Sequence, residues 1–468
     1  MQPLSRAPVA TTTLSRAWRS FSTLPIAERN AQPARRTPLL SRAPARPSSP
    51  RLLLCRRCQQ TRGYGSSSVS IPTTAGLSTT SRDETAKKSE PLRILFCGSD
   101  EFSCAALEAL HREHVRDPEL IRSIDVVARP GKRTGRGYKV IQHPPIRELA
   151  TKLGLPVHER DTFTGWDMPP HTNLIIAVSF GLFVPPRLLR RARFGGLNLH
   201  PSALPDLRGP APLQHALLAG RRAAAVCLQT LDHAAFDRGL VLARSAPLRI
   251  PPDATYGRLR DLVAPLAAGL LVRGLRGGVH VSPLEEVEVE GEMEEKELLH
   301  APKITKRDRR VQVDHLPHLW RRYRALGPLW FYSSAPRQGR KRVILETMAH
   351  DRPDFVPGDA PLVVGDASSP VGCGGESSGA AVPYLVPLEP DPDADDGTTA
   401  GTIGNREGEE RTPHLVVWLP GEGGAHGGAC WLGDCRVETV KVEGQRAKPA
   451  ALALGDFLVR ARTGKPVV

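Results

Sequence analysis

The stretch NLHPSALPDLRGPAPLQ, from Asn198 to Gln214, decides the fold. It sets an asparagine and a histidine two residues apart at what reads as a strand end, and two proline-containing turns follow. Side chains two apart on a strand point to the same face. We therefore expect Asn198 and His200 to point together into the crevice at the carboxyl end of the strand, where open α/β sheets bind ligands. An amide donor beside an imidazole suits attack on a carbonyl, because one group stabilises the oxyanion and the other transfers the proton.

Predicted strands and helices alternate on both sides of this stretch. PLRILFCGSDEF (Pro91–Phe102) predicts a strand that turns into a helix, IDVVARP (Ile124–Pro130) a second strand, and NLIIAVSFGLFVP (Asn173–Pro185) a strongly buried one. Farther on, residues 224–250 predict two antiparallel strands around a loop. We therefore expect an α/β domain with a doubly wound, mostly parallel sheet over residues 91–282. The first turn lacks the GxGxxG pattern, so the dinucleotide fingerprint is absent there.

The remainder of the chain predicts a second, smaller domain. Residues 283–302 contain an acidic run that we interpret as a linker, and residues 303–468 predict a basic, β-barrel-like C-terminal domain. Within that domain, residues from about 351 to 412 are rich in Pro, Gly, Asp and Ser, a composition typical of a disordered insertion. The strand-like segments HLVVWLP and ACWLGDCRVETVKVEG follow, and ALALGDFLVRART predicts a final helix.

The basic charge of the chain is concentrated at its N-terminus. The formal net charge is +15, but residues 1–82 alone contain thirteen arginines, no lysine and one acidic residue, Glu28. The global charge is therefore a poor argument for nucleic-acid binding, and any RNA contact must come from local patches. An Arg- and Ser-rich, acid-poor N-terminus is typical of a mitochondrial transit peptide, although a generic disordered tail has a similar composition. We expect residues 1–90 to be a targeting segment and the protein to lie in the mitochondrial matrix.

Neither a membrane span nor a metal site is predicted. No apolar run reaches the roughly 18 residues that a bilayer crossing requires, so we expect a soluble protein. The eight cysteines are scattered. Cys55 and Cys58 form a CxxC inside the predicted targeting segment, and Cys430 and Cys435 have no histidine cluster beside them. We interpret the cysteines as free thiols in a reducing compartment and expect no bound metal.

A carboxylate that could partner the histidine follows in LDHAAFDRG. An imidazole needs such a group to orient it and to favour its protonated form. Either Asp232 or Asp237 could serve, and Asp237, which Arg238 and Gly239 follow, is the better placed in a tight turn. Taken alone, an aspartate that caps the turn is an equally good interpretation.

These residues together resemble the methionyl-tRNA formyltransferase family, in a fungal-type mitochondrial form. The resemblance runs from about Leu92 to the C-terminus, without the acidic run and the insertion. The family's Asn-x-His pair is matched by Asn198 and His200, and its catalytic aspartate by Asp237. Its SLLP-type turn is matched by Ser202–Pro205, its Arg-Gly-x-Ala-Pro turn by Arg208–Pro212, and the Gly-Arg-Gly core of its basic loop by Gly135–Gly137.

The resemblance implies a formyltransferase-like fold and a specific enzymatic reaction. The formyl group of 10-formyltetrahydrofolate would pass to the α-amino group of methionine on initiator tRNA. Asn198 and a protonated His200 would stabilise the oxyanion, and Asp237 would orient His200. The amine itself is the nucleophile, so neither a Ser or Cys nucleophile nor a metal is needed.

The resemblance also assigns residues to the two substrates of a protein that we expect to be monomeric. Folate would be held by Ser179, Phe180, Gly181 and Leu182 and by Ser202, Ala203, Leu204 and Pro205. The tRNA would be contacted by Lys132, Arg133, Arg136, Lys139 and Arg208, although a solvated basic loop has the same composition. An electrostatic track for RNA phosphates could be formed by Lys303, Lys306, Arg307, Arg309, Arg310, Arg321, Arg322, Arg324, Arg337, Arg340, Lys341 and Arg342.

Three positions depart from the family's pattern. Pro201 follows the histidine where the family often has glycine, and Leu240 stands where bacterial members often have a second aspartate. Asp206 stands where the bacterial turn is basic, which weakens a direct RNA role for this turn. None of these departures touches Asn198, His200 or Asp237.

Two alternative functions remain open at this stage. Another folate-dependent formyltransferase that acts on a small amine would use the same three residues, but it would not need the basic C-terminal domain or an organellar address. A non-catalytic RNA-binding descendant would not need all three catalytic residue types.

Overall fold

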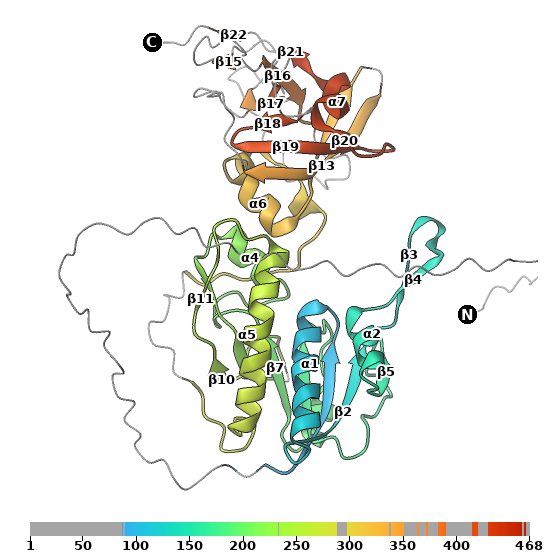
Figure 1. Cartoon of the computed structure of the whole chain (residues 1–468), viewed down its shortest axis with the longest axis vertical. Helices are drawn as coiled ribbons and strands as arrows, with labels where there is room; N and C mark the ends of the chain where they lie inside the picture. Colours follow the sequence, from blue (N-terminus) through green and yellow to red (C-terminus); the bar gives the residue numbers. More distant parts are fainter. Residues whose placement is uncertain are drawn as a thin grey trace, which may run out of the picture. The chain divides into compact units, whose positions relative to one another are not determined.

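The structure is a computed structural model of the chain (Figure 1). It describes residues 87, 89–232, 234–287, 297–336, 338–350, 363–364, 371–372, 382–389, 414–419, 429–460 and 463–464. Almost all of the predicted targeting segment, most of the acidic run and most of the predicted insertion lie outside the described residues. Within the described part of the chain, no helix has both the length and the apolar character that a membrane crossing requires.

Seven of the described strands form one sheet in the order β10-β9-β7-β6-β1-β2-β5. Their bounds are β1 Leu92–Gly98, β2 Ile121–Ala128, β5 Val157–Glu159, β6 Leu174–Val178, β7 Gly196–His200, β9 Cys227–Thr230 and β10 Val241–Arg244. The pairs from β7 to β5 are parallel, and β9 and β10 are antiparallel. The prediction of a doubly wound, mostly parallel sheet is confirmed, and the strand order reverses at β1, where such sheets open their binding crevice.

Helices cover both faces of this sheet. Their bounds are α1 Glu101–Arg116, α2 Pro145–Lys152, α3 Pro186–Arg191, α4 Pro212–Leu218 and α5 Tyr256–Arg276. Helix α1 begins where it does because the Asp100 side chain accepts a bond from Ser103 N at 3.0 Å. Helices α1 and α5 lie side by side in front of the sheet (Figure 1). A small two-stranded sheet pairs β8 (Ala223–Ala224) with β11 (Leu248–Arg249).

The alternation of side chains along β7 determines where its polar residues point. Leu197 and Leu199 are buried in the main hydrophobic core, which also contains the apolar residues of α1 and α5. A second core cluster, which contains Leu188 of α3, packs on the opposite face. Because successive strand residues face opposite ways, Asn198 and His200 point away from α1 and α5.

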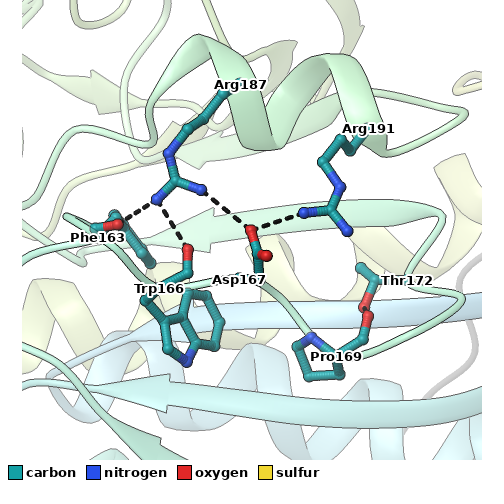
Figure 2. A network of polar contacts seen from close by, with 7 residues as sticks. All are labelled: Phe163, Trp166, Asp167, Pro169, Thr172, Arg187 and Arg191. Atoms are coloured by element: carbon teal, nitrogen blue, oxygen red, sulfur yellow. Dashed lines mark hydrogen bonds and ion pairs between the residues drawn. The ribbon is translucent and has the colours of Figure 1, made fainter.

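A polar network attaches α3 to the segment that leads into β6. Figure 2 shows Arg187 and Arg191 of α3 on either side of Asp167. The closest nitrogen–oxygen distances to the Asp167 carboxylate are 3.4 Å from Arg187 and 2.7 Å from Arg191. Arg187 also donates to the backbone oxygens of Phe163 and Trp166. The two ion pairs of Asp167 are largely exposed and lie on one side of α3.

The basic segment predicted as a loop forms a β-hairpin that projects from the sheet (Figure 1). Strand β3 (Lys132–Thr134) pairs antiparallel with β4 (Val140–Gln142) across the turn η1 (Arg136–Tyr138). The turn has positive φ at Gly135, Gly137 and Tyr138. The two glycines supply this conformation without steric cost, and this allows the β-branched residues on either side to pair.

The C-terminal domain is a largely antiparallel sheet in the order β12-β13-β19-β18-β17-β16-β21. These strands span β12 Leu329–Ala335, β13 Gly339–His350, β16 Val382–Pro387, β17 His414–Leu419, β18 Cys430–Leu432, β19 Cys435–Val442 and β21 Val459–Arg460. The short strands are β14 Val363–Val364, β15 Val371–Gly372, β20 Lys448–Pro449 and β22 Thr463–Gly464, and the helical pieces are η3 Arg307–Arg309, η4 Val313–His318, α6 Leu319–Leu326, α7 Ala450–Leu454 and η5 Gly455–Phe457. A bridge between Tyr332 and Glu389 joins β12 to the end of β16 and gives the sheet the predicted barrel-like closure.

Two sequence predictions in this domain need correction. The predicted insertion, 351–412, contains strand β16, which pairs with β17 and β21, and its Leu385 and Val386 are fully buried. The apolar run VPYLVP is short, and the Pro- and Gly-rich composition around it concealed its strand character. The final helix predicted over ALALGDFLVRART is short, because α7 ends at Leu454 and the chain continues into β21.

Candidate active site

The three residues predicted to be catalytic lie together at the carboxyl end of β7. Asn198 and His200 are on the same face of that strand, and Asp237 comes from the loop between β9 and β10. His200 Nδ1 lies 3.3 Å from Asp237 Oδ1, and Asn198 Nδ2 donates to the same oxygen at 2.9 Å. His200 is 5% exposed. The geometry therefore joins a carboxamide, an imidazole and a carboxylate in one contiguous group.

Two further donors hold the Asp237 carboxylate. Gln229 Nε2 donates to Oδ1 at 3.2 Å, and the backbone N–H of Gly209 donates to Oδ2 at 2.9 Å. Neither donor was predicted from the sequence. Gln229 could have been noticed in the sequence, because it is a polar residue inside the apolar strand segment VCLQTL. In the structure it pairs with Asn198 on the neighbouring strand. The contact from Gly209 is made by its backbone N–H, so the residue type gives no indication of it.

The backbone around Asp237 explains the Asp-Arg-Gly sequence. Asp237 has φ of +54°, a left-handed conformation that aspartate tolerates better than most residues. At Gly239 a Cβ atom would lie 1.8 Å from the carbonyl oxygen of Thr230, so only glycine fits. Asp232, the alternative partner, accepts bonds from the backbone of Ala234 and Ala235 and so caps the loop. The position beside His200 therefore belongs to Asp237.

Burial governs the charge of His200. Burial lowers the pKa of His200 below its usual value, and the Asp237 carboxylate and the Leu207 carbonyl oppose this shift in part. The ring contacts Leu207 O through Nε2 at 3.1 Å. Leu207 O and the Asp237 carboxylate only accept hydrogen bonds, so a neutral ring can donate to one of them and a protonated ring to both. Burial therefore opposes the expected protonation of His200, whereas its two acceptor neighbours favour it.

The first predicted folate segment, residues 179–182, directly follows β6, the parallel neighbour of β7. Ser179 and Gly181 have positive φ, and Phe180 is buried in the second core cluster. Burial raises the pKa of Asp100 at the end of β1, while bonds from the Ser103 backbone and from the Ser179 side chain lower it. The segment thus lies at the crevice end of the sheet.

The second predicted folate segment is the turn 202–205. Ser202 and Leu204 are buried, and the Ser202 hydroxyl donates to the backbone oxygen of Asp206 at 2.7 Å. Ala203 is exposed and Pro205 is half-buried. The side chains of Ser202 and Leu204 therefore contact other parts of the protein, and Ala203 is the exposed residue of the turn.

The predicted tRNA residues lie in two places. Lys132, Arg133 and Lys139 are exposed on the β3–β4 hairpin. The backbone of Arg136 belongs to η1, and its side chain lies outside the described part. Arg208 is half-buried beside the active site, where its Nε donates to the backbone oxygen of Asp237 at 3.0 Å.

Metal-binding groups do not gather in the part of the chain that the structure describes. No cluster of three or more His, Cys, Asp or Glu side chains occurs there. Burial raises the pKa of the thiols of Cys97, Cys227 and Cys430, which favours the protonated form over the thiolate that binds metals.

Comparisons with known proteins identify the family of the chain. The formyl transferase family model matches residues 92–275. The mitochondrial methionyl-tRNA formyltransferase of Saccharomyces cerevisiae is 30% identical over 306 residues, which cover 56% of this chain and 75% of that protein. The Methylococcus capsulatus methionyl-tRNA formyltransferase is 32% identical over 60% of this chain and 89% of that protein, and the human mitochondrial enzyme is 31% identical over 53% and 60%. A solved sugar N-formyltransferase from a Shewanella species matches with a TM-score of 0.38 and 14% identity, over 50% of this chain and 88% of that chain. The chain therefore belongs to the methionyl-tRNA formyltransferase family.

Proposed function

We propose that this protein transfers the formyl group of 10-formyltetrahydrofolate to the α-amino group of methionine on initiator tRNA, in the mitochondrial matrix. The observation that carries the proposal is the convergence of Asn198, His200 and Asp237 within the residues that match the formyl transferase family. The mitochondrial location is supported by the names of the yeast and human relatives and by the Arg-rich N-terminus.

His200 is proposed to act as the base that takes a proton from the attacking amine. Leu207 O and Asp237 Oδ1 both accept hydrogen bonds, so the neutral ring donates to one of them and takes the amine proton at its other nitrogen. The amine nitrogen forms a bond to the formyl carbon, and the bond between that carbon and the donor nitrogen breaks. The proton that His200 has taken then passes to the departing donor nitrogen. Asp237 stabilises the imidazolium that exists between these two events.

Asn198 is proposed to stabilise the oxyanion that forms on the formyl oxygen. One of its two amide hydrogens is used by Asp237, and this fixes the orientation of the amide. The second hydrogen is then available to the developing negative charge. A preorganised donor of this kind is worth about 3 kcal/mol of barrier lowering, or a factor of roughly 10² to 10³ in rate.

The residues around the site suit a flat heteroaromatic donor. Phe183, which follows the first folate segment, contacts Phe236, which precedes Asp237, edge to face at a centroid distance of 5.5 Å. Both rings are exposed, at 36% and 61%. Gln229 adds a buried oxygen, Oε1, that has no hydrogen-bond partner. These features provide apolar ring surface and one unused acceptor for a pterin-containing molecule.

Two basic surfaces are proposed to hold the tRNA backbone. The first is the β3–β4 hairpin with Lys132, Arg133 and Lys139. The second is a cavity of about 580 Å³ whose lining includes Lys306, Arg309 and Arg324 and contains no acidic residue. Phosphate contacts of this type position a nucleic acid and make its binding sensitive to salt.

The test is a formylation assay with the purified protein and the folate donor. Initiator Met-tRNA should be formylated and elongator Met-tRNA should react poorly. His200→Ala and Asn198→Ala should each lose most of the rate, about 10² to 10³-fold for Asn198→Ala, while their circular dichroism stays that of the parent. Undiminished turnover in both variants would refute the site. RNA binding without any formyl transfer by the parent protein would instead favour a non-catalytic RNA-binding role.

A further inference from the structure

Residues 297–301, at the end of the acidic linker, run alongside the loop 206–211 next to the active site. We call residues 297–301 the strap. The two segments are joined like neighbouring strands, with a parallel bridge between Arg208 and His300. The backbone bonds are Leu207 N to Leu299 O at 2.8 Å, Ala301 N to Arg208 O at 2.7 Å and Ala211 N to Ala301 O at 3.2 Å.

Asp206 fastens the strap through its side chain. Its Oδ1 accepts the backbone N–H of Leu299 at 2.9 Å. Arg221 Nη2 lies 3.2 Å from each carboxylate oxygen of Asp206 and also donates to the backbone oxygen of Glu297 at 3.0 Å. The Asp206 side chain is 8% exposed, so this is a buried carboxylate whose partners are the strap and a cation that also binds the strap.

The strap fits closely against the loop. Gly209 has φ of +123°, and a Cβ atom there would lie 2.4 Å from the backbone oxygen of Ala301. Ala301 itself is fully buried. Because the neighbouring atom is backbone, the loop and the strap can approach this closely only if residue 209 is glycine.

The loop that the strap holds carries two contacts of the catalytic group. The carbonyl of Leu207 accepts from His200 Nε2, and the N–H of Gly209 donates to Asp237 Oδ2. Leu207 makes its contact from a left-handed backbone conformation, with φ of +59°. Displacing the strap would therefore move an orienting partner of His200 and a donor to Asp237 at the same time.

We infer that Asp206 is a positioning residue for formyl transfer, because it binds the strap to the loop whose backbone orients His200 and Asp237. This inference rests on the proposed function. It gives Asp206 a role inside the protein in place of the RNA contact that a basic residue could make in this turn. Asp206 does not touch the reacting atoms, so its effect must pass through His200 and Asp237.

The experiment compares Asp206→Asn, Asp206→Ala and a matched control, Asp167→Asn. Asparagine keeps an acceptor for Leu299 N but loses the ion pair with Arg221, whereas alanine loses both. The control removes a carboxylate that is also shared with arginine, on the exposed network of Figure 2. In the full-length protein, kcat should fall on the order of tenfold for Asp206→Asn and further for Asp206→Ala, because small displacements of catalytic groups cost this much. KM for Met-tRNA should change little, and Asp167→Asn should match the parent.

A second readout follows the imidazole itself and does not need activity. In protein labelled with ¹⁵N-histidine, the His200 signal, assigned by its loss in His200→Ala, is titrated with acid. Its pKa should fall in both Asp206 variants, because the Leu207 contact that raises it is loosened. Parent-like kcat together with a parent-like His200 titration in both Asp206 variants would overturn the inference. If Asp206→Ala does not fold, Asp206→Asn and Arg221→Ala carry the test.

The two readouts separate this inference from the proposed function. Should His200→Ala retain full turnover, the function proposal fails, while a shifted His200 titration in the Asp206 variants would still show the coupling. Should His200→Ala lose turnover while the Asp206 variants behave like the parent in both readouts, only the positioning role of Asp206 fails.

Discussion

Asn198 and Gln229 lie opposite each other across the antiparallel pairing of β7 and β9, and both carboxamides donate to Oδ1 of Asp237. Directly opposed residues point to the same face of a sheet, so this register places two amide donors at a single carboxylate oxygen. Gln229 is 1% exposed, so its contact with the Asp237 carboxylate is buried. The proposed catalytic group is thus held by the sheet as well as by the loops.

The first prediction concerns Gln229. Gln229→Leu keeps approximately the same volume and removes the donor to Asp237. A hydrogen bond to a charged group is worth about 1.5–3 kcal/mol, so kcat should fall roughly 10- to 100-fold. Gln229→Glu should fall further, because it places a second carboxylate against Asp237. Steady-state kinetics at constant pH measure both, and parent-like kcat in Gln229→Leu would exclude a role for this contact.

The second prediction is the pH dependence of turnover. Burial lowers the pKa of His200 below its ordinary 6.5, and the proposed base is the neutral ring. The rate should fall with acid below the pKa of the attacking amine, about 8, and a second fall that belongs to His200 should begin under pH 6.5. The ionisable groups around the ring include Asp237, which contacts Nδ1, Arg208, which donates to the Asp237 backbone, and Cys227, the cross-strand neighbour, whose thiol pKa burial raises. A rate that rises as the pH falls from 6.5 would favour a protonated His200 at rest.

The third prediction concerns stability and rests on His280. Burial lowers the pKa of His280 from 6.5 to about 4, and its ring packs edge to face on Phe194 at 4.9 Å and contacts Ser89 Oγ at 2.9 Å. Because the unfolded chain binds the proton more readily, this contribution to stability is complete above pH 6.5 and is lost as the pH falls toward 4. The loss is at most about 3 kcal/mol.

Denaturant unfolding at several pH values measures this effect, with His280→Phe as the comparison. Phenylalanine keeps the aromatic contact and cannot titrate. Its free energy of unfolding should therefore depend less on pH between 6.5 and 4 than that of the parent. Identical pH profiles for the two proteins would show that His280 is not the group responsible.

The fourth prediction tests the hairpin. Replacing Lys132, Arg133 and Lys139 together by alanine should raise KM for Met-tRNA and flatten its salt dependence, because fewer counterions are released on binding. Since these residues lie on the β3–β4 hairpin and outside the catalytic group, kcat should change little. Arg112→Ala, an exposed position on α1, serves as the control. An unchanged salt slope in the triple variant would place the tRNA contacts elsewhere.

Local sequence patterns were sufficient to predict the parallel sheet and the shared face of Asn198 and His200. The apolar runs of β1 and β6 and the turn after β7 are local features, and period 2 is enough to place Asn198 and His200 on one face. From the sequence alone, the carboxylate partner of His200 could be narrowed to Asp232 or Asp237. The structure excludes Asp232, because its carboxylate accepts bonds from the loop backbone at Ala234 and Ala235. These contacts depend on the folded backbone and cannot be read from the sequence.

Contacts made by backbone or between distant segments could not be predicted. Leu207 and Gly209 act through their carbonyl and N–H groups, which every residue type carries. The bond from Asp206 to Leu299 joins residues 93 apart in the chain, and no periodicity links them. The burial that lowers the pKa of His200 could not be predicted for a related reason, since it arises from the packing of whole elements around the ring.

The last prediction uses the corrected boundaries of the insertion. Pro387 and His414 pair at the end of the antiparallel β16 and β17, so these two ends lie close enough to be joined by a short connection. Replacing residues 390–412 by a short Gly- and Asn-containing turn should keep the melting temperature and turnover near those of the parent. Removing the whole of 351–412 should instead destabilise the C-terminal domain, because it deletes β16 and the buried Leu385 and Val386. Thermal unfolding of the two deletions side by side measures the difference, and equal stability would mean that β16 contributes nothing to this sheet.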